Sequence, residues 1–133
     1  MRKSAGVLLY RTNPFRVLLV QSYGGKYGPA KGHFDENETP EECASRELQE
    51  ETGIQMSSGL ISTFPRTRIR NTYIYYIPFP KHFVWNPDST TVDREITDIR
   101  WFIPDGIPVE LNSIGKHSLK KLRARQFKRP DNG

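Results

Sequence analysis

The chain has 133 residues, a length that predicts a single domain with one core over residues 1–133. It is 35% hydrophobic and 11% aromatic, and no apolar run approaches the ~18 residues of a membrane span, which excludes a membrane-spanning chain and indicates a soluble globular protein. The net charge of +5 predicts an anionic partner or substrate, and the lone Cys43 excludes an internal disulfide and fits a cytoplasmic compartment.

Two apolar runs begin the chain. Ala5 to Tyr10 and Val17 to Ser22 are rich in Val and Leu and flank the turn-like Thr12-Asn13-Pro14, so they predict a hairpin of buried strands. The next segment, YGGKYGPAKG, predicts a loop, because its four glycines permit backbone conformations that other residues avoid. Such a loop either approaches a ligand closely or is an ordinary surface loop.

The helix signals that follow agree with one another. Thr39 suits a cap, Pro40 suits the first helical position, and Glu42 completes a Thr-x-x-Glu capping box. Gly53 stands where a left-handed residue would end a helix. Together they predict a helix from about residue 40 to residue 52.

The second half of the chain alternates between strand and turn patterns. Ile61 to Phe64 predicts a short strand, Thr67 to Phe79 a long one and Glu95 to Phe102 another, with the turn-rich WNPDSTT between the last two. Leu111 to Phe127 predicts a helix. The order strand, strand, helix, several strands, helix predicts a mixed α/β sandwich.

Acidic residues are concentrated in the segment GHFDENETPEECASRELQEETGI, residues 32–54. Eight of the fifteen Asp and Glu residues lie between Asp35 and Glu51, where Arg46 is the only base. On a helix that advances ~100° per residue, Glu47, Glu50 and Glu51 fall within one ~100° sector and repel one another. A divalent cation would relieve that repulsion, and Mg²⁺ or Mn²⁺ prefers oxygen ligands. The alternative is a solvated helix face that carries glutamates.

The same segment fits the spacing Gly-x5-Glu-x7-Arg-Glu-apolar-x-Glu-Glu-x-Gly-apolar and resembles the Nudix box. The matching positions are Gly32, Glu38, Arg46, Glu47, Leu48, Glu50, Glu51, Gly53 and Ile54. The resemblance implies a Nudix-type α/β/α sandwich with a mixed β-sheet. It also implies an enzyme that uses Mg²⁺ or Mn²⁺ to hydrolyse nucleoside diphosphates linked to another moiety.

The resemblance assigns roles position by position. The metal ligands it implies are Glu47, Glu50 and Glu51, with the Gly32 carbonyl as a further ligand. Arg46 would orient the glutamates through ion pairs, Glu38 would brace the loop to the helix, and Leu48 and Ile54 would lie in the core.

A base must also take the proton of the attacking water. Glu50 or Glu51 is the first choice for that base, and Glu95, in DREITDIRWF, is the second. The alternative for Glu95 is an ordinary exposed acid at the end of a strand.

The segment PAKGH bears on the substrate. It is similar to the PKGH of asymmetric dinucleoside tetraphosphate hydrolases, and related forms occur in mRNA-decapping and diphosphoinositol-polyphosphate enzymes. Those enzymes usually read Trp-Gly-aromatic-Pro-Lys-Gly, whereas this chain has Tyr-Gly-Pro-Ala-Lys-Gly at residues 27–32. Dinucleoside polyphosphates or related nucleotides are the first-choice substrates, and RNA 5′ ends, as in decapping, and diphosphoinositol polyphosphates are the alternatives.

Several basic and aromatic residues are candidates to bind such a substrate. Lys31 could meet a phosphate as a point charge or be a solvated loop lysine. Arg66, Arg68 and Arg70 alternate along the predicted strand and so share a face, which suits either phosphate binding or protection of an edge strand. The aromatic residues that could stack on a base or instead fill the core are Tyr73, Tyr75, Tyr76, Phe83 and Trp85.

The basic C-terminal segment KKLRARQFKRP either binds RNA or forms a solvated helix face. Binding to RNA would weaken steeply with salt, because neutralised phosphates release counterions. A catalytically idle RNA-binding module is therefore the alternative from another class of protein, and the complete set of acids in residues 32–54 favours an enzyme. The expected partner is a small phosphorylated molecule, and the expected assembly is a monomer or a homodimer.

Overall fold

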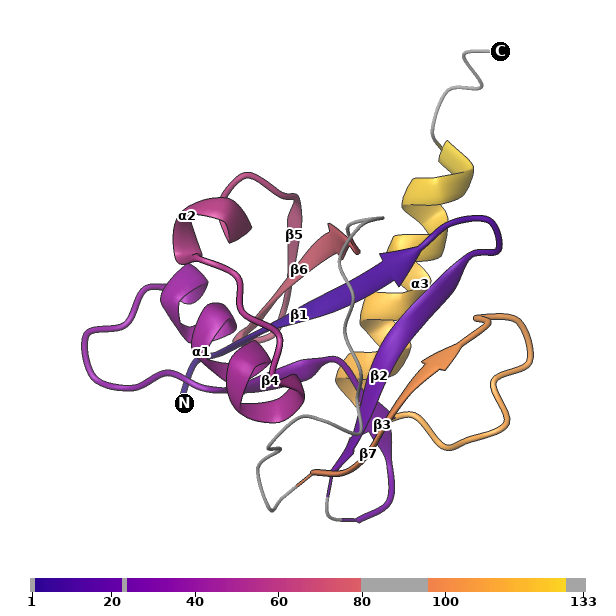
Figure 1. Cartoon of the computed structure of the whole chain (residues 1–133), viewed down its shortest axis with the longest axis horizontal. Coiled ribbons are helices and arrows are strands. Elements are labelled where there is room, and N and C mark those ends of the chain that lie inside the picture. Colours follow the sequence, from indigo (N-terminus) through magenta and orange to yellow (C-terminus); the bar gives the residue numbers. More distant parts are fainter. Residues whose placement is uncertain (1, 23, 80–95, 129–133) are drawn as a thin grey trace.

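The computed structural model describes residues 2–22, 24–79 and 96–128, and within them seven strands form one mixed sheet (Figure 1). Its order is β3-β2-β1-β6-β5, with β4 also paired to β1 and β7 also paired to β2. The strands are β1 (Ser4–Arg11), β2 (Arg16–Ser22), β3 (Tyr27–Gly28), β4 (Ala30–His33), β5 (Arg66–Ile69), β6 (Thr72–Pro78) and β7 (Ile96–Phe102). The helices are α1 (Pro40–Thr52), α2 (Ser58–Ile61) and α3 (Ser113–Lys128).

Strand β1 is the centre of this sheet. It pairs antiparallel with β2 at its C-terminal end, antiparallel with β4 along its N-terminal half, and parallel with β6 along most of its length. A strand with neighbours on both edges and helices over both faces has no solvent face, which explains the unbroken apolar run of β1. The hairpin predicted from residues 5–10 and 17–22 is confirmed.

Successive residues of β1 point into two different cores. Val7 and Leu9 pack in the cluster that includes Leu48 of α1 and Ile61 of α2. Leu8, on the opposite face, packs in the cluster that contains two side chains of α3, Leu119 and Leu122. Figure 1 shows α1 and α2 on one side of the sheet and α3 on the other. The predicted α/β/α sandwich with a mixed sheet is thus confirmed.

The expected strand at residues 61–64 is wrong. Residues Ser58–Ile61 form the short helix α2, and the side chain of Ser57 accepts a hydrogen bond from the backbone N–H of Leu60. This cap starts a helix at Ser58. The apolar run that follows is too short for its pattern to distinguish a helix from a strand, which explains the wrong prediction.

The single long strand expected over residues 67–79 is also wrong, because the chain turns back within it. Arg70 adopts a left-handed φ of 56°, and β5 and β6 pair as a hairpin on either side of the turn at residues 70–71. The segment therefore supplies two strands, with β5 at the edge of the sheet.

The loop predicted over residues 23–32 contains two short strands. Tyr27 and Gly28 pair with β2, and Tyr27 is buried. Residues 30–33 pair with β1 from Val7 to Ser4. The prediction of a strand over residues 95–102 is confirmed for Ile96–Phe102, whereas WNPDSTT and Glu95 lie outside the described residues. No helix in the described part of the chain is long and apolar enough to cross a membrane.

Candidate active site

Helix α1 carries the acidic cluster, and its limits follow from its sequence. The Thr39 hydroxyl accepts a hydrogen bond from the Glu42 N–H at 3.1 Å, and the Glu42 carboxylate accepts one from the Thr39 N–H at 2.9 Å. Gly53 ends the helix with φ of 80° and donates its N–H to the Gln49 carbonyl. The predicted helix, capping box and left-handed end are all confirmed.

One face of α1 is docked on the sheet. Cys43, Ala44 and Leu48 are completely buried, and they pack in the same cluster as the β1 residues Val7 and Leu9. This docking fixes which way the remaining helix positions point, since residues three and four apart share a face.

Arg46 is the hub of the acidic cluster. Its Nε and Nη2 donate to the two carboxylate oxygens of Glu38 at 2.7 and 2.9 Å, and Nη2 also donates to the His33 carbonyl at 2.9 Å. Its Nη1 donates to Glu47 Oε1 at 2.9 Å and to Glu50 Oε2 at 3.2 Å. Hydrogen bonding to Glu38 raises the pKa of Arg46 further above its ordinary value, and hydrogen bonding from Arg46 lowers the pKa of Glu38. The expected ion pairs therefore form.

Glu38 also ties the preceding loop to the helix. Its Oε1 accepts the backbone N–H of Asp35 at 2.7 Å, while the same carboxylate holds the Arg46 fork. A bidentate arginine–carboxylate pair is directional as well as strong, so it holds the loop against α1 in one orientation.

Glu47 and Glu51 lie beside each other in the cluster. Glu47 is buried, with 8% of its surface exposed, whereas Glu51 is partly buried and its Oε1 accepts the Lys31 N–H at 3.2 Å. Burial, together with the charge of Glu47, raises the pKa of Glu51 to about 8. Burial likewise raises the pKa of Glu47. Two acids that resist ionising together are an arrangement that a cation would relieve.

Gly32 lies directly against this pair. A Cβ placed on Gly32 would collide with the Glu47 carboxylate, so only glycine lets β4 approach the helix this closely. The Gly32 carbonyl accepts the Cys43 Sγ–H at 3.4 Å, on the buried side of α1.

The glutamate oxygens of the cluster are the kind of ligand that a hard divalent cation binds. They are not all close enough together to bind one. Within residues 2–22, 24–79 and 96–128, no group of three or more His, Cys, Asp or Glu side chains is positioned to hold a metal ion. Glu47 and Glu51 lie together, whereas Glu50 is half-exposed and paired with Arg46. Carboxylate oxygens beside a glycine cradle are what Mg²⁺ or Mn²⁺ takes as ligands, so the residues suit such an ion.

The predicted stripe of three arginines does not exist as expected. Arg66 and Arg68 lie on one face of β5, with guanidinium carbons 4.9 and 5.5 Å from the ring centre of Tyr73. Arg70 lies in the turn, and its carbonyl accepts the Nε–H of Arg68. Its left-handed backbone takes it out of the strand alternation on which the prediction rested.

Arg66 is further occupied by a contact with α1. It pairs with Glu41 at 3.4 Å and donates to the Tyr75 hydroxyl at 3.1 Å, and that hydroxyl in turn donates to Glu41. This network joins the edge strand β5 to the first turn of the helix. It was not predicted, because the three residues are far apart in sequence.

Tyr76 is not available to a substrate, and its prediction is wrong. It is 2% exposed and packs between the sheet and α3, where its hydroxyl donates to the Ser118 carbonyl at 3.1 Å. Tyr75, on the opposite face, is also buried. The other aromatic candidates Phe83 and Trp85, like the second-choice base Glu95, lie outside the described residues.

A polar group near β3 was missed by sequence reasoning. The Tyr27 hydroxyl donates to Asp98 at 2.5 Å, and Arg100 donates to the same carboxylate at 2.6 Å and to the hydroxyl at 3.0 Å. The signal in the sequence was the spacing of Asp98 and Arg100, two apart and therefore on the same face of β7.

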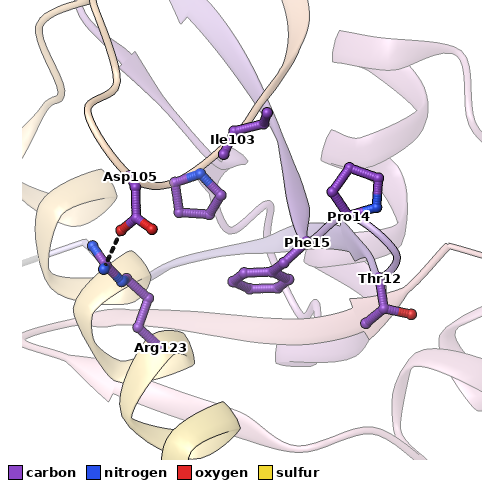
Figure 2. A pocket seen from close by; sticks show the side chains of 7 residues that line it. Thr12, Pro14, Phe15, Ile103, Asp105 and Arg123 are labelled. Atoms are coloured by element: carbon purple, nitrogen blue, oxygen red, sulfur yellow. Dashed lines mark hydrogen bonds and ion pairs between the residues drawn. The ribbon is translucent and has the colours of Figure 1, made fainter.

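One apolar hollow lies away from the acids. It has a volume of about 350 Å³ and is lined by Thr12, Pro14, Phe15, Ile103, Pro104, Asp105 and Arg123. Figure 2 shows Asp105 and Arg123 paired at one side of it and the Phe15 ring between that pair and Thr12. No acid of the α1 cluster contributes to its lining, so this hollow is separate from the candidate active site.

Comparison with known proteins shows which protein family this chain matches. The model of the NUDIX domain matches residues 1–122. The protein 111R of Invertebrate iridescent virus 3 is 40% identical over 80 residues, which are 59% of this chain and 46% of that protein. The m7GpppN-mRNA hydrolase dcap-2 of Caenorhabditis elegans is 32% identical over 114 residues, which are 79% of this chain and 14% of that protein. The chain thus spans less than half the length of these two relatives.

Among solved structures, a C. elegans Ap4A hydrolase in a binary complex resembles the chain with a TM-score of 0.65. The two are 21% identical, and the match covers 96% of this chain and 98% of that one. At this identity the likeness supports the fold alone, and it agrees with the layers and the mixed sheet described above.

Proposed function

This chain belongs to the NUDIX family, and from that premise we propose that it is a pyrophosphohydrolase that depends on a divalent cation. NUDIX hydrolases generally require such a cation, for example Mg²⁺ or Mn²⁺. The reaction is substitution by water at a phosphorus of a phosphoanhydride, in a nucleoside diphosphate that is linked to another moiety.

The observation that carries the proposal is the placement of Glu47 and Glu51 against Gly32. Both carboxyls have raised pKa values, and a Cβ on Gly32 would collide with Glu47, so the pair suits an oxygen-coordinated cation. Glu47, Glu51 and Glu50 would hold the ion, with the Gly32 carbonyl as a further ligand. Glu50 would have to exchange its contact with Arg46 for the ion.

The chain's own residues prepare this arrangement. Arg46 orients Glu47 and Glu50, and Glu38 fixes Arg46 in turn. When bound, the divalent cation neutralises phosphate charge and lowers the pKa of water. Glu51 is our choice for the base that accepts the proton of the attacking water, because Arg46 already pairs with Glu47 and Glu50. Glu50 and Glu95 remain the alternatives.

The substrate we propose is a molecule in which two nucleosides are joined through their 5′ positions by a chain of phosphates. Dinucleoside polyphosphates are the simplest of this class. A capped RNA 5′ end contains the same linkage, and the identity of 32% to an m7GpppN-mRNA hydrolase over 79% of this chain favours it as the second candidate. Diphosphoinositol polyphosphates follow, and a non-catalytic RNA-binding module comes last.

Lys31 and Arg68 are the phosphate contacts we propose. Lys31 lies on β4 between Ala30 and Gly32, its backbone N–H donates to Glu51, and its side-chain charge lies near enough to act on the Glu51 carboxyl. Arg68 is exposed on β5, and no carboxylate pairs with it among the residues that the structure describes. Arg66 is the weaker candidate, because Glu41 already holds it.

The test is a substrate panel in ¹⁸O-labelled water with Mg²⁺ or Mn²⁺. The panel contains diadenosine tetraphosphate, capped RNA and a diphosphoinositol polyphosphate, and mass spectrometry of the products gives both the substrate and the phosphorus attacked. Glu51→Gln should lower the rate ~10²–10⁴-fold, as expected for loss of a base or ligand. Glu36→Gln removes an equal charge from an exposed loop position outside the cluster and should retain full activity. Absence of metal-dependent cleavage across the panel, or equal activity of the two variants, would contradict the proposal.

A further inference from the structure

Two arginines face each other at the end of the β1–β2 hairpin. Arg11 and Arg16 are Cα partners in the antiparallel pairing of these strands, and both side chains are partly buried. Directly opposed residues of an antiparallel pair project from the same face, with Cβ atoms ~5 Å apart, and like charges so placed are destabilising. An anion between them would remove that repulsion.

Neither guanidinium has a carboxylate partner in the described ranges, where the arginines with ion pairs are Arg46, Arg66, Arg100 and Arg123. The Nε of Arg16 is shut off from solvent and has no hydrogen-bond partner in that part of the chain. Buried donors in folded proteins almost always have an acceptor. Within these residues the Arg16 Nε–H is therefore an unsatisfied donor, which a ligand would reach through a shift of the Arg16 side chain.

Arg11 is held in place without being neutralised. Its guanidinium carbon lies 4.6 Å from the ring centre of Phe79 and 5.1 Å from that of Trp101. The two rings pack edge to face, with centres 5.4 Å apart. Aromatic faces attract a cation through their quadrupole and leave its charge intact, so they position Arg11 for a further, anionic contact.

The two arginines open onto a hollow with a volume of about 440 Å³. Among the residues that the structure describes, its lining is formed by Tyr10, Arg11, Thr12, Arg16, Pro78 and Phe79, which include no acid. This volume lies within the ~300–1,000 Å³ of small-molecule pockets. A phosphate monoester, with ~1.5–2 negative charges at neutral pH, matches two guanidinium groups in charge, and its oxygens match their fork geometry. A single carboxylate would leave one of the two positive charges unbalanced.

We propose that this hollow, which we call the hairpin site, binds the phosphate group of a small anion. The ligand is either inorganic phosphate or a nucleoside monophosphate, which share this group. The hairpin site is distinct from the acidic cluster: Gly32 and Lys31 lie opposite Ala5 and Gly6 at the start of β1, and Arg11 ends that strand. At ~3.4 Å per residue the separation along β1 is about 17–20 Å.

The test follows the Arg16 Nε–Hε signal in ¹H–¹⁵N spectra of the metal-free protein in EDTA, during titration with inorganic phosphate and with AMP. The signal should move and saturate. Arg16→Met and Arg11→Met, read from the remaining arginine signal and by calorimetry, should each weaken binding at least tenfold. Arg2→Met removes the same charge from an exposed position outside the hairpin site and should leave affinity unchanged.

The outcomes show which of the two ligands the hairpin site binds, and they can refute the proposal. Tighter binding of AMP than of phosphate identifies a nucleotide site, and equal binding identifies a phosphate site. If neither ligand shifts the Arg16 signal, or if Arg2→Met weakens binding as much as Arg16→Met, the hairpin site is refuted. Binding of a 5′-hydroxyl oligoribonucleotide through the same arginines, without binding of inorganic phosphate or AMP, would refute the ligand class. Because no metal or turnover is involved, the result is independent of the proposed hydrolase activity.

Discussion

Glu51 lies beside Glu47 on α1 and accepts a hydrogen bond from the backbone N–H of Lys31. Burial raises the pKa of Glu51 to about 8, and the charge of Glu47 adds to the shift. A carboxyl whose pKa is higher in the folded than in the unfolded chain stabilises the fold below its ordinary pKa. That contribution is lost as the pH rises through the folded value.

The metal-free protein should therefore become less stable between about pH 5 and pH 9. Glu51→Gln keeps an acceptor for the Lys31 N–H and cannot ionise, so it should raise the free energy of unfolding at pH 9 by ~1–2 kcal/mol and flatten the pH dependence. Thermal unfolding in EDTA at pH 6 and pH 9 measures both effects. Glu36→Gln, at an exposed position, should follow the wild type. If the pH dependence of Glu51→Gln matches that of the wild type, the raised pKa of Glu51 is refuted.

Gly32→Ala should damage the site sterically. The added Cβ would collide with the Glu47 carboxylate, so the variant should lose ~1–3 kcal/mol of stability through overpacking, together with metal binding. Urea unfolding and Mn²⁺ titration by calorimetry provide the readouts. Gly59→Ala is the matched control, because a Cβ there meets nothing nearer than Ser57 Oγ at 4.0 Å. An unaffected Mn²⁺ affinity in Gly32→Ala would place the ion elsewhere.

Arg46→Lys should fail even though it conserves charge. Lysine cannot bridge both oxygens of Glu38 and also reach Glu47 and the His33 carbonyl, so two largely buried carboxylates would lose partners. We expect a loss of about 2–4 kcal/mol in the free energy of unfolding, measured with urea. The same substitution at the exposed Arg100 should leave the unfolding midpoint unchanged. Equal midpoints for both variants would show that the Arg46 hub adds nothing to the fold.

Cys43 should be chemically inert in the folded protein. It is completely buried, and burial together with the charge of Glu38 raises the pKa of its thiol to about 12. The thiolate is the reactive form, so alkylation by iodoacetamide at pH 8 should be slow and should accelerate strongly in denaturing urea. Mass spectrometry of the alkylated chain measures the rate. Rapid alkylation of native protein would mean that α1 separates readily from the sheet.

The parts of the fold that could be predicted are those fixed by local chemistry. The limits of α1 follow from Thr39, Glu42 and Gly53, whose capping roles need no distant partner. The hairpin of β1 and β2 follows from two apolar runs around a turn. In the same way, the placement of three glutamates and Arg46 on one helix was readable from residue spacing alone.

The misses have a different origin. The turn at Arg70 contains neither Gly nor Pro, so the strand pattern appeared continuous from residue 67 to residue 79. Tyr75 and Tyr76 are both buried, because β6 has a core on each face, and a strand without a solvent face gives no alternation to read. The network of Glu41, Arg66 and Tyr75 joins residues that only the tertiary fold brings together.

The parallel pairing of β1 with β6 has a consequence for how the chain folds. Strand β1 finds one of its two long-edge neighbours only after residues 72–78 have been made, whereas its hairpin with β2 is local. During translation β1 must therefore wait with one edge unpaired, the period in which a growing chain is most open to aggregation. Helix α1, which lies between the two strands in sequence, is synthesised during that wait, and in the folded chain it packs on the face of β1 that carries Val7 and Leu9.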